Sequence, residues 1–507
     1  MPQYLLAHDI GTSGDKATLF DTDGKLAAAH TSAYETNFFN NNWAEQDPAD
    51  WWPAVCESTR ALLADINPGD VACVALSGQM MGCLPVDSAG APLRPSMIYC
   101  DQRAVDQADH LTAEIGAEAF YAIVGHRISA SYSIEKLMWL KANEPDIYAA
   151  TAHMLNAKDY INFKLTGQIA TDYSDASGTN AFDLNTFKWS DTVIQAAGID
   201  ASMLPQARAS TDILGTITAE AAKATGLLEG TPVAIGGGDG SCAAVGVGCV
   251  RAGMAYGYVG SSSWIAMASE KPIVDEQMRT MNWAHVVPGY LHPAGTMQTA
   301  GSSYQWLKNE ICLTEVAAAE AQGVDPYQLI DAQIAGSPPG AGGLIFLPYL
   351  LGERTPRWNP NARGAFIGLT LGHKRADMLR AVLEGVTYNL CIIADIFRAK
   401  VPFDSVTVIG GGAKGAVWRQ MMADIYNCRI DKLNVLEEAT SMGAAVTAGV
   451  ACGVFENFDV IERFVSSDST HQPDPDAVKA YDKIKPIFEK SYHALVDVYE
   501  DLARLPS

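Results

Sequence analysis

Two aspartates stand in small-residue turns where proton transfer or metal binding could take place. Asp9 lies in YLLAHDIGTSGDKATLF, residues 4–20, and Asp239 lies in VAIGGGDGSCAAVGVG, residues 233–248. Each follows an apolar run, at a point where a buried strand ends. One carboxylate can hold Mg²⁺, which prefers oxygen ligands and keeps much of its water. The other can accept a proton from a hydroxyl. A hairpin turn at Asp9 and a helix cap at Asp239 are the purely structural alternatives.

Two short turns could hold phosphate groups. Successive backbone N–H groups in a tight turn form a nest that binds anions. The three glycines before Asp239 lose more entropy on ordering than other residues would. Their presence therefore indicates that a neighbouring group or a ligand approaches the backbone closely there. Combined with the two acids, the turns suggest phosphoryl transfer from ATP, although each could also be an ordinary polar turn. Their residues are Gly11, Thr12 and Ser13, and Gly260, Ser261 and Ser262.

A third glycine-rich turn, GGGAKG at residues 410–415, matches the spacing of a dinucleotide-binding fingerprint. It follows a strand-like run, precedes the helical pattern AVWRQMMADI, and has Asp431 about twenty residues after its start. NAD binding is therefore one interpretation of this turn. A loop that binds the adenosine part of ATP explains the same glycines equally well. It is also compatible with phosphate binding by the other two turns.

The segment SGQMMG, residues 77–82, ends another predicted strand. Gln79 can both donate and accept hydrogen bonds with a sugar hydroxyl. Met80 and Met81 are either core residues or part of a carbohydrate pocket. We interpret Asp101 and Arg103, in YCDQR, as a surface ion pair. The histidines show no zinc-binding spacing.

The strand and turn pattern occurs twice along the chain. A hairpin is predicted over residues 4–20 and again over 254–268, and strands ending in small residues are predicted at 71–79 and 406–415. This repeat predicts two similar α/β halves whose glycine turns meet at a cleft, with a boundary near residues 250–254. Long helical patterns follow at residues 376–399, 441–453 and 475–503.

Composition limits the class of protein. The chain has 507 residues, and its 35 Lys and Arg against 58 Asp and Glu give a net charge of −23, which disfavours nucleic acid as a partner. No apolar run approaches the roughly 18 residues of a membrane span. The ten cysteines include no CxxC pair, so we expect reduced thiols in the core and a cytoplasmic location.

In the order of its motifs, the chain resembles the FGGY family of carbohydrate kinases, and within it the xylulose kinases. The resemblance covers residues 4–455. The motifs that carry it are DIGTSGDKA, WAEQDPADWW, SGQM, SIEKLMWLKAN, AKDYINFKLTG, TDYSDASGT, GGGDGSCAAVG, GYVGSSS, AGSSYQWL, LPYLLGERTPRWNPNARGAFIGLTLGH and GGGAKGAVWRQMMAD.

The resemblance implies two ribonuclease-H-like α/β domains of the actin and heat-shock ATPase superfamily around a central cleft. It implies a sugar-binding domain with the catalytic base over residues 1–252, and a nucleotide-binding domain with a helical tail over 253–507. By the resemblance, Asp9 holds Mg²⁺ through water and Asp239 is the base. Gln79, Met80, Met81 and Asp239 bind sugar, Thr12 and Ser261 contact phosphates, and Gly301, Gln305, Gly411, Gly412 and Ala413 contact the nucleotide.

The chain departs from the xylulose kinase pattern at three positions. Met81 stands where those kinases have histidine, Gly240 where they commonly have asparagine, and Ala416 where the family often has asparagine. The first two positions face sugar in the family, so another sugar or polyol remains open beside D-xylulose.

The expected activity is ATP-dependent phosphorylation of a sugar hydroxyl. A ketopentose such as D-xylulose, giving D-xylulose 5-phosphate, is the first candidate, with Mg²⁺ as cofactor and a homodimer as the family's default assembly. Two alternatives from other classes are an NAD-dependent dehydrogenase using GGGAKG and an actin-like or chaperone-like ATPase acting on a protein.

Overall fold

The first half of the chain forms a six-stranded sheet. The computed structural model describes residues 4–434 and 438–505. The strand order is β14-β15-β6-β1-β2-β3. The strand β1 is apolar and flanked on both sides, as expected of a central strand buried on both faces. The strands are β1 (Tyr4–Ile10), β2 (Gly14–Asp21), β3 (Leu26–Ala33), β6 (Val71–Gly78), β14 (Ile213–Thr216) and β15 (Pro232–Gly238).

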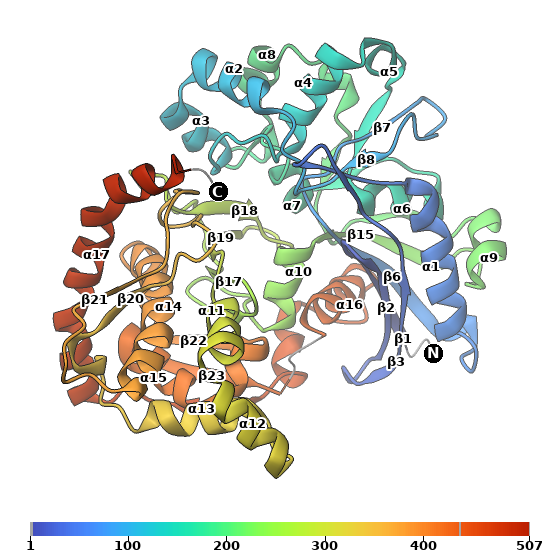
Figure 1. Cartoon of the computed structure of the whole chain (residues 1–507). Helices are drawn as coiled ribbons and strands as arrows, with labels where there is room; N and C mark the ends of the chain where they lie inside the picture. The colour runs from blue at the N-terminus through green and yellow to red at the C-terminus, as the bar shows by residue number, and fades with distance from the viewer. Residues whose placement is uncertain (1–3, 435–437, 506–507) are drawn as a thin grey trace.

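The second half forms a seven-stranded sheet in the order β18-β19-β17-β16-β22-β23-β24. The two sheets lie on opposite sides of the molecule in Figure 1. The strands of the second sheet are β16 (Ala255–Val259), β17 (Ser263–Met267), β18 (Met281–Ala284), β19 (Leu291–Met297), β22 (Ser405–Ile409), β23 (Arg429–Leu433) and β24 (Ser467–His471).

The two sheets repeat one arrangement, which confirms the predicted duplication. In the first sheet, β1 pairs antiparallel with β2 and parallel with β6. In the second, β16 pairs antiparallel with β17 and parallel with β22. The glycine turns that follow β1 and β16 therefore occupy equivalent corners of the two halves.

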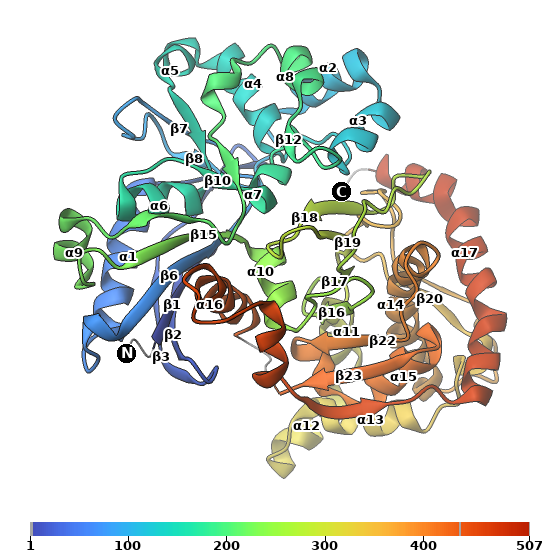
Figure 2. The ribbon, with the colours of Figure 1, turned by 180° about the vertical axis from the view of Figure 1, so that it is seen from behind.

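Two helices cross between the sheets, α10 (Asp239–Gly246) and α16 (Ala439–Ala451). A Cβ on Gly246 would lie 1.7 Å from the carbonyl oxygen of Ala439, and one on Gly443 would lie 1.8 Å from that of Cys242. Only glycine permits such contact. Although α16 lies between β23 and β24 of the second sheet in the chain, it packs on the first sheet, as Figures 1 and 2 show from opposite sides.

The remaining elements surround these layers. In Figure 1, α2 to α5 and α8 form a lobe above the first sheet, and α17 runs along the outer side of the second half. The helices of the first half are α1 (Pro48–Leu62), α2 (Val105–Ile115), α3 (Ala117–Val124), α4 (Ser133–Asn143), α5 (Pro145–Ala150), α6 (Ala157–Thr166), α7 (Tyr173–Ser177), α8 (Asp191–Ala197) and α9 (Ala219–Thr225). Those of the second are α11 (Gly301–Trp306), α12 (Leu313–Gln322), α13 (Pro326–Ala335), α14 (Arg375–Arg398), α15 (Ala416–Tyr426) and α17 (Pro475–Ala503).

Short strands complete the structure. They are β4 (Asn37–Phe39), β5 (Trp43–Gln46), β7 (Leu84–Val86), β8 (Ser96–Met97), β9 (His153–Leu155), β10 (Thr171–Asp172), β11 (Phe182–Asp183), β12 (Lys188–Trp189), β13 (Ala207–Arg208), β20 (Ile345–Leu347) and β21 (Ala365–Ile367). Across residues 4–434 and 438–505, no helix combines the length and apolarity needed to cross a bilayer. The ten cysteines are free thiols, and all except Cys100 and Cys452 are buried.

Candidate active site

A cavity of about 350 Å³ lies between the two halves, and the predicted turns supply part of its lining. The first half contributes Thr12, Gln79, Met80, Met81 and Tyr99, followed by Asp239, Gly240, Ser241 and Ala243 at the start of α10. The second half contributes Trp264, Trp283, His292, Ala294, Thr296 and Thr440. We call this space the first cavity.

Asp239 is the first residue of α10, directly after the glycines that end β15. Gly236 has a φ of 75°, and a Cβ there would lie 1.9 Å from the carbonyl oxygen of Leu76. The glycine run therefore allows β15 to pass against β6 and to present Asp239 to the cavity. The carboxylate accepts a 2.7 Å hydrogen bond from the Gly240 N–H. Although the side chain is open to the cavity, the surrounding protein displaces water and raises the pKa of Asp239 to about 6.

Asp9 is the next-to-last residue of β1, and one oxygen of its carboxylate has no hydrogen-bond partner among the described residues. Its Oδ1 is buried and makes no hydrogen bond to any residue that the structure describes. Burial, and then the negative charge of Asp239, raises the pKa of Asp9 to about 7. An unpaired buried carboxylate oxygen is costly unless a cation or a proton compensates it. Asp9 is therefore suited to hold a cation beside Asp239.

Gln79 follows β6 and ties the first glycine turn to the cavity. Its Nε2 donates to Gln46 Oε1 at 2.7 Å and to the Gly11 carbonyl at 3.4 Å. The Nε2 of Gln46 in turn donates to the Thr12 carbonyl at 2.7 Å. Gln79 Oε1 is buried without a partner among the described residues. The sequence-based prediction missed Gln46, which reaches the turn from a separate short strand.

The turn after β1 differs in detail from the anion nest that the sequence suggests. The Gly11 N–H donates to the Gly14 carbonyl at 3.0 Å, so this amide is already used inside the turn. Thr12 lines the first cavity, whereas Ser13 is exposed outside its lining. Of the three predicted phosphate contacts here, the structure brings only Thr12 to the cavity.

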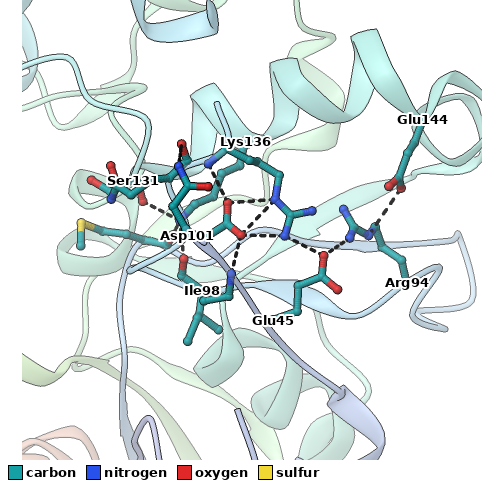
Figure 3. A network of polar contacts seen from close by, with 12 residues as sticks. Glu45, Arg94, Ile98, Asp101, Ser131, Lys136 and Glu144 are labelled. Atoms are coloured by element: carbon teal, nitrogen blue, oxygen red, sulfur yellow. Dashed lines mark hydrogen bonds and ion pairs between the residues drawn. The ribbon is translucent and has the colours of Figure 1, made fainter. Parts of the chain in front are cut away.

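Met80 and Met81 form one wall of the first cavity. Met81 has a φ of 62°, a backbone conformation that non-glycine residues rarely adopt. Its carbonyl accepts a 2.8 Å hydrogen bond from Lys136 Nζ. The same buried ammonium group also donates to the carbonyls of Ile98 and Ser131. Lys136 therefore fixes the turn that carries Met81, and Figure 3 shows Lys136 beside Ile98 and Ser131.

The interpretation of Asp101 and Arg103 as a surface ion pair is wrong. Both side chains are buried, with Arg103 Nη2 lying 2.6 Å from Asp101 Oδ2. The guanidinium group also pairs with Glu45 at 2.8 Å and stacks over the ring of Trp43, 3.8 Å from its centroid. Figure 3 shows Asp101 and Glu45 in the same network as Lys136. Aromatic residues distant in sequence cover the pair, which YCDQR alone did not indicate.

A second cavity of about 460 Å³ lies in the second half and gathers most of the predicted nucleotide contacts. A Cβ on Gly301 would lie 2.3 Å from the Gly260 carbonyl oxygen, so these two turns meet in close backbone contact. A Cβ on Gly411 would meet nothing within 4 Å, so Gly411 faces open space. The lining includes the predicted Gly260, Ser261, Gly301, Gln305, Gly411 and Gly412. It also includes Lys414 and Gly415 of the predicted GGGAKG turn. The lining residues that were not predicted are Tyr258, Tyr304, Asp325, Tyr327, Asp331 and Trp418.

Two predicted nucleotide contacts lie elsewhere. Ala413 is fully buried, and Ser262 is exposed outside the lining of the second cavity. Asp431, the acid of the candidate dinucleotide fingerprint, lies on β23. Its two carboxylate oxygens accept hydrogen bonds from Arg429 and Thr470. This acid is therefore occupied by protein groups.

Family models match almost the whole chain. The N-terminal domain of the FGGY family of carbohydrate kinases matches residues 4–246, and the C-terminal domain matches residues 255–452. The chain belongs to the FGGY family of carbohydrate kinases. It is therefore a carbohydrate kinase, and the dehydrogenase and protein-directed ATPase alternatives are set aside.

Relatives of two specificities match about equally well. The xylulose kinase of Bacillus subtilis (strain 168) is 32% identical over 494 residues, covering 97% of both chains. The gluconokinase of Bacillus licheniformis is 30% identical over 505 residues, covering 99% of this chain and 98% of the relative. Both relatives are sugar kinases, but the sugar in their names differs.

Solved structures support the expected fold class. The crystal structure of xylulose kinase from Rhodospirillum rubrum superposes with a TM-score of 0.91 at 29% identity, covering 98% of this chain and 100% of that chain. The chain has the two-domain α/β fold of FGGY kinases, which belongs to the actin and heat-shock ATPase superfamily. The two sheets described above are the two ribonuclease-H-like halves of that fold.

Proposed function

We propose that this kinase transfers the terminal phosphoryl group of ATP to a hydroxyl of an uncharged sugar, with D-xylulose, giving D-xylulose 5-phosphate, as the first candidate. One observation carries the proposal. The first cavity presents the carboxylate of Asp239, and no lysine or arginine occurs among the described residues that line it. A sugar acid would bring a second negative charge to a space without a cation to pair it.

Histidine does not supply that cation. Burial lowers the pKa of His292, the imidazole in the lining, to about 3, so the ring is neutral near pH 7. Placing the carboxylate of gluconate beside Asp9 and Asp239 would leave a desolvated charge unpaired, which is strongly unfavourable. The cavity therefore favours a ketopentose over gluconate. The apolar wall of Met80, Met81 and two tryptophans also suits a polyol or a sugar with fewer hydroxyls.

Asp239 has the position and the pKa of a general base. A base works best when its pKa lies near the working pH, and a value of about 6 leaves Asp239 mostly deprotonated at pH 7. Its place at the first turn of α10 aims the carboxylate into the first cavity. In the proposed reaction Asp239 accepts the proton of the sugar hydroxyl as the hydroxyl oxygen attacks the phosphorus atom.

The nucleotide occupies the second cavity in this proposal. Tyr258, Tyr304 and Trp418 offer aromatic surfaces for adenine, and Gly411 leaves space against which the ligand can lie. The turns at Ser261 and Thr12 approach the phosphates from the two halves. We assign sugar binding and the base to residues 1–252 and nucleotide binding to 253–507, with a homodimer as the proposed assembly.

The residues around Asp9 fit a magnesium ion. Its buried Oδ1 lacks a partner among the described residues, and a carboxylate that contacts Mg²⁺ through water is common in phosphoryl-transfer sites. When bound, Mg²⁺ would neutralise charge on the ATP phosphates. The chain's own contribution is a buried carboxylate beside Asp239 whose raised pKa a bound cation would lower again.

An ADP-release assay over a panel of sugars tests the proposed substrate. D-Xylulose, D-ribulose, xylitol and gluconate are compared at matched concentrations. We expect kcat/KM for D-xylulose to exceed that for gluconate by about 100-fold or more, because an unpaired buried charge costs several kcal/mol. A preference for gluconate would overturn the proposal.

A further inference from the structure

His292 connects the second half of the protein to the start of the catalytic helix. It lies on β19, is buried, and lines the first cavity. Its Nε2 lies 3.2 Å from the hydroxyl oxygen of Tyr256. The Tyr256 hydroxyl donates to the carbonyl of Gly240, at 3.3 Å. A chain of polar contacts thus runs from the cavity wall to the residue that follows Asp239.

The single proton of the Tyr256 hydroxyl can be given to the Gly240 carbonyl at 3.3 Å or to Nε2 of His292 at 3.2 Å. In the arrangement in which the Gly240 carbonyl receives it, the Nε2 of the neutral imidazole must carry the ring proton and donate it to the Tyr256 oxygen. The other nitrogen, Nδ1, becomes a hydrogen-bond acceptor, and it has no partner among residues 4–434 and 438–505.

Gly240 leaves space beside this ring. A Cβ at residue 240 would lie 3.7 Å from Cε1 of His292, so the absent side chain opens a gap between the imidazole and α10. The ring of Tyr256 lies nearly parallel to that of His292, at 10°, with the two ring centroids 5.9 Å apart. Asp239 and His292 therefore border one space from opposite halves.

We propose that His292 is a sugar-binding residue of this kinase, whose Nδ1 accepts a hydrogen bond from a substrate hydroxyl, and that Tyr256 is the positioning residue that fixes the ring. This inference rests on the proposed function, because it concerns the same cavity. It adds a specificity contact from the nucleotide-binding half, so that a bound sugar contacts both halves.

Substitutions that separate the ring acceptor from packing test the proposal. His292→Leu removes the acceptor with little change in volume, and His292→Asn retains an acceptor close to the position of Nδ1. We expect His292→Leu to raise KM for D-xylulose about 10-fold while KM for ATP stays within about twofold, because one hydroxyl loses its partner. We expect His292→Asn to recover most of the affinity, and Tyr256→Phe to be intermediate.

A matched control is His285, a second buried histidine nearby. Its Nε2 contacts the Cys249 carbonyl and its Nδ1 accepts from the Val287 N–H, and it does not line the cavity. His285→Leu should lower the melting temperature without a selective change in KM for sugar. The proposal is overturned if His292→Leu keeps the wild-type KM for sugar, or if it behaves like His285→Leu.

Sugar binding without ATP gives a second readout. Trp264 and Trp283 line the first cavity, so D-xylulose binding should change tryptophan fluorescence. The dissociation constant from this titration should rise about 10-fold in His292→Leu. If wild-type protein prefers gluconate, the proposed function fails, and the same variants are then titrated with gluconate. An unchanged dissociation constant for the preferred sugar would overturn the His292 assignment separately.

Discussion

The carboxyl group of Asp239 lies close enough to Asp9 for its charge to add to burial in raising the pKa of Asp9 to about 7. Asp9 lies on β1 and Asp239 directly follows β15, and these two strands flank β6 in one sheet. Like charges close together disfavour ionisation of both groups. Their proximity therefore costs free energy in the folded protein, and a cation bound at Asp9 would lower that cost.

Activity should depend on pH through Asp239. The group acts as a base only when deprotonated, and its pKa is about 6 because of burial. Between pH 5 and pH 7 the deprotonated fraction rises about tenfold, so kcat/KM for sugar should rise by a similar factor. A pH–rate profile with saturating Mg-ATP measures this. A flat profile from pH 5 to pH 8, in protein whose circular dichroism is unchanged, would contradict the assignment.

The contribution of Asp9 to the free energy of unfolding should fall as pH rises, whereas the activity that depends on Asp239 should increase. Burial raises the folded pKa of Asp9 from the ordinary value of 3.8 to about 7, so its contribution to stability is present below pH 3.8 and is lost as pH rises through 7. Asp9→Asn should therefore raise the melting temperature at pH 8, without ligands, and have little effect at pH 4. Thermal unfolding at both pH values tests this. Destabilisation at pH 8 would show that the carboxylate is well satisfied in the native state.

Local sequence patterns predicted the two aspartates and the duplicated sheets because both depend on short motifs. Three glycines before an acid and a strand followed by a small-residue turn are visible within ten residues. The walls of the cavities were not predictable in this way. Trp264, Trp283 and His292 occupy ordinary strand positions, and they meet Asp239 only when the second sheet packs against α10.

The burial of Asp101 and Arg103 was likewise not predictable from the local sequence. Charged residues in a short segment usually lie on the surface. Here Trp43 and Glu45, on the distant strand β5, cover and pair the guanidinium group. Which charge is buried depends on these long-range contacts, and a single sequence does not specify them.

Lys136 should be required for both stability and the sugar pocket. Lys136→Met leaves the carbonyls of Met81, Ile98 and Ser131 without their buried donor. We expect a loss of about 3–5 kcal/mol in the free energy of unfolding, and a higher KM for sugar in the protein that remains folded. Urea denaturation and steady-state kinetics measure the two effects.

The control is Lys141→Met, at an exposed position on the same helix α4. It should change the free energy of unfolding by less than about 0.5 kcal/mol. Equal effects at the two positions would contradict the role of Lys136.

Two alanine substitutions should distinguish the nucleotide site from its supporting backbone. Gly411→Ala adds a methyl group into open space in the second cavity, so the protein should fold normally while KM for ATP rises several-fold. Gly301→Ala places a Cβ 2.3 Å from the Gly260 carbonyl oxygen, so it should destabilise the fold by about 1–3 kcal/mol. Kinetics with varied ATP and thermal melts separate the outcomes. A Gly411→Ala enzyme with unchanged KM for ATP would place the nucleotide elsewhere.

The most direct measurement of the central claim is the turnover of Asp239→Asn together with its affinity for sugar. The amide keeps the size of the side chain but cannot accept the hydroxyl proton as a base. The account predicts that kcat falls by about 10² to 10⁴, with the dissociation constant for D-xylulose, from tryptophan fluorescence, within about threefold of wild type. Near-normal kcat in this variant would contradict the role of Asp239 as the base.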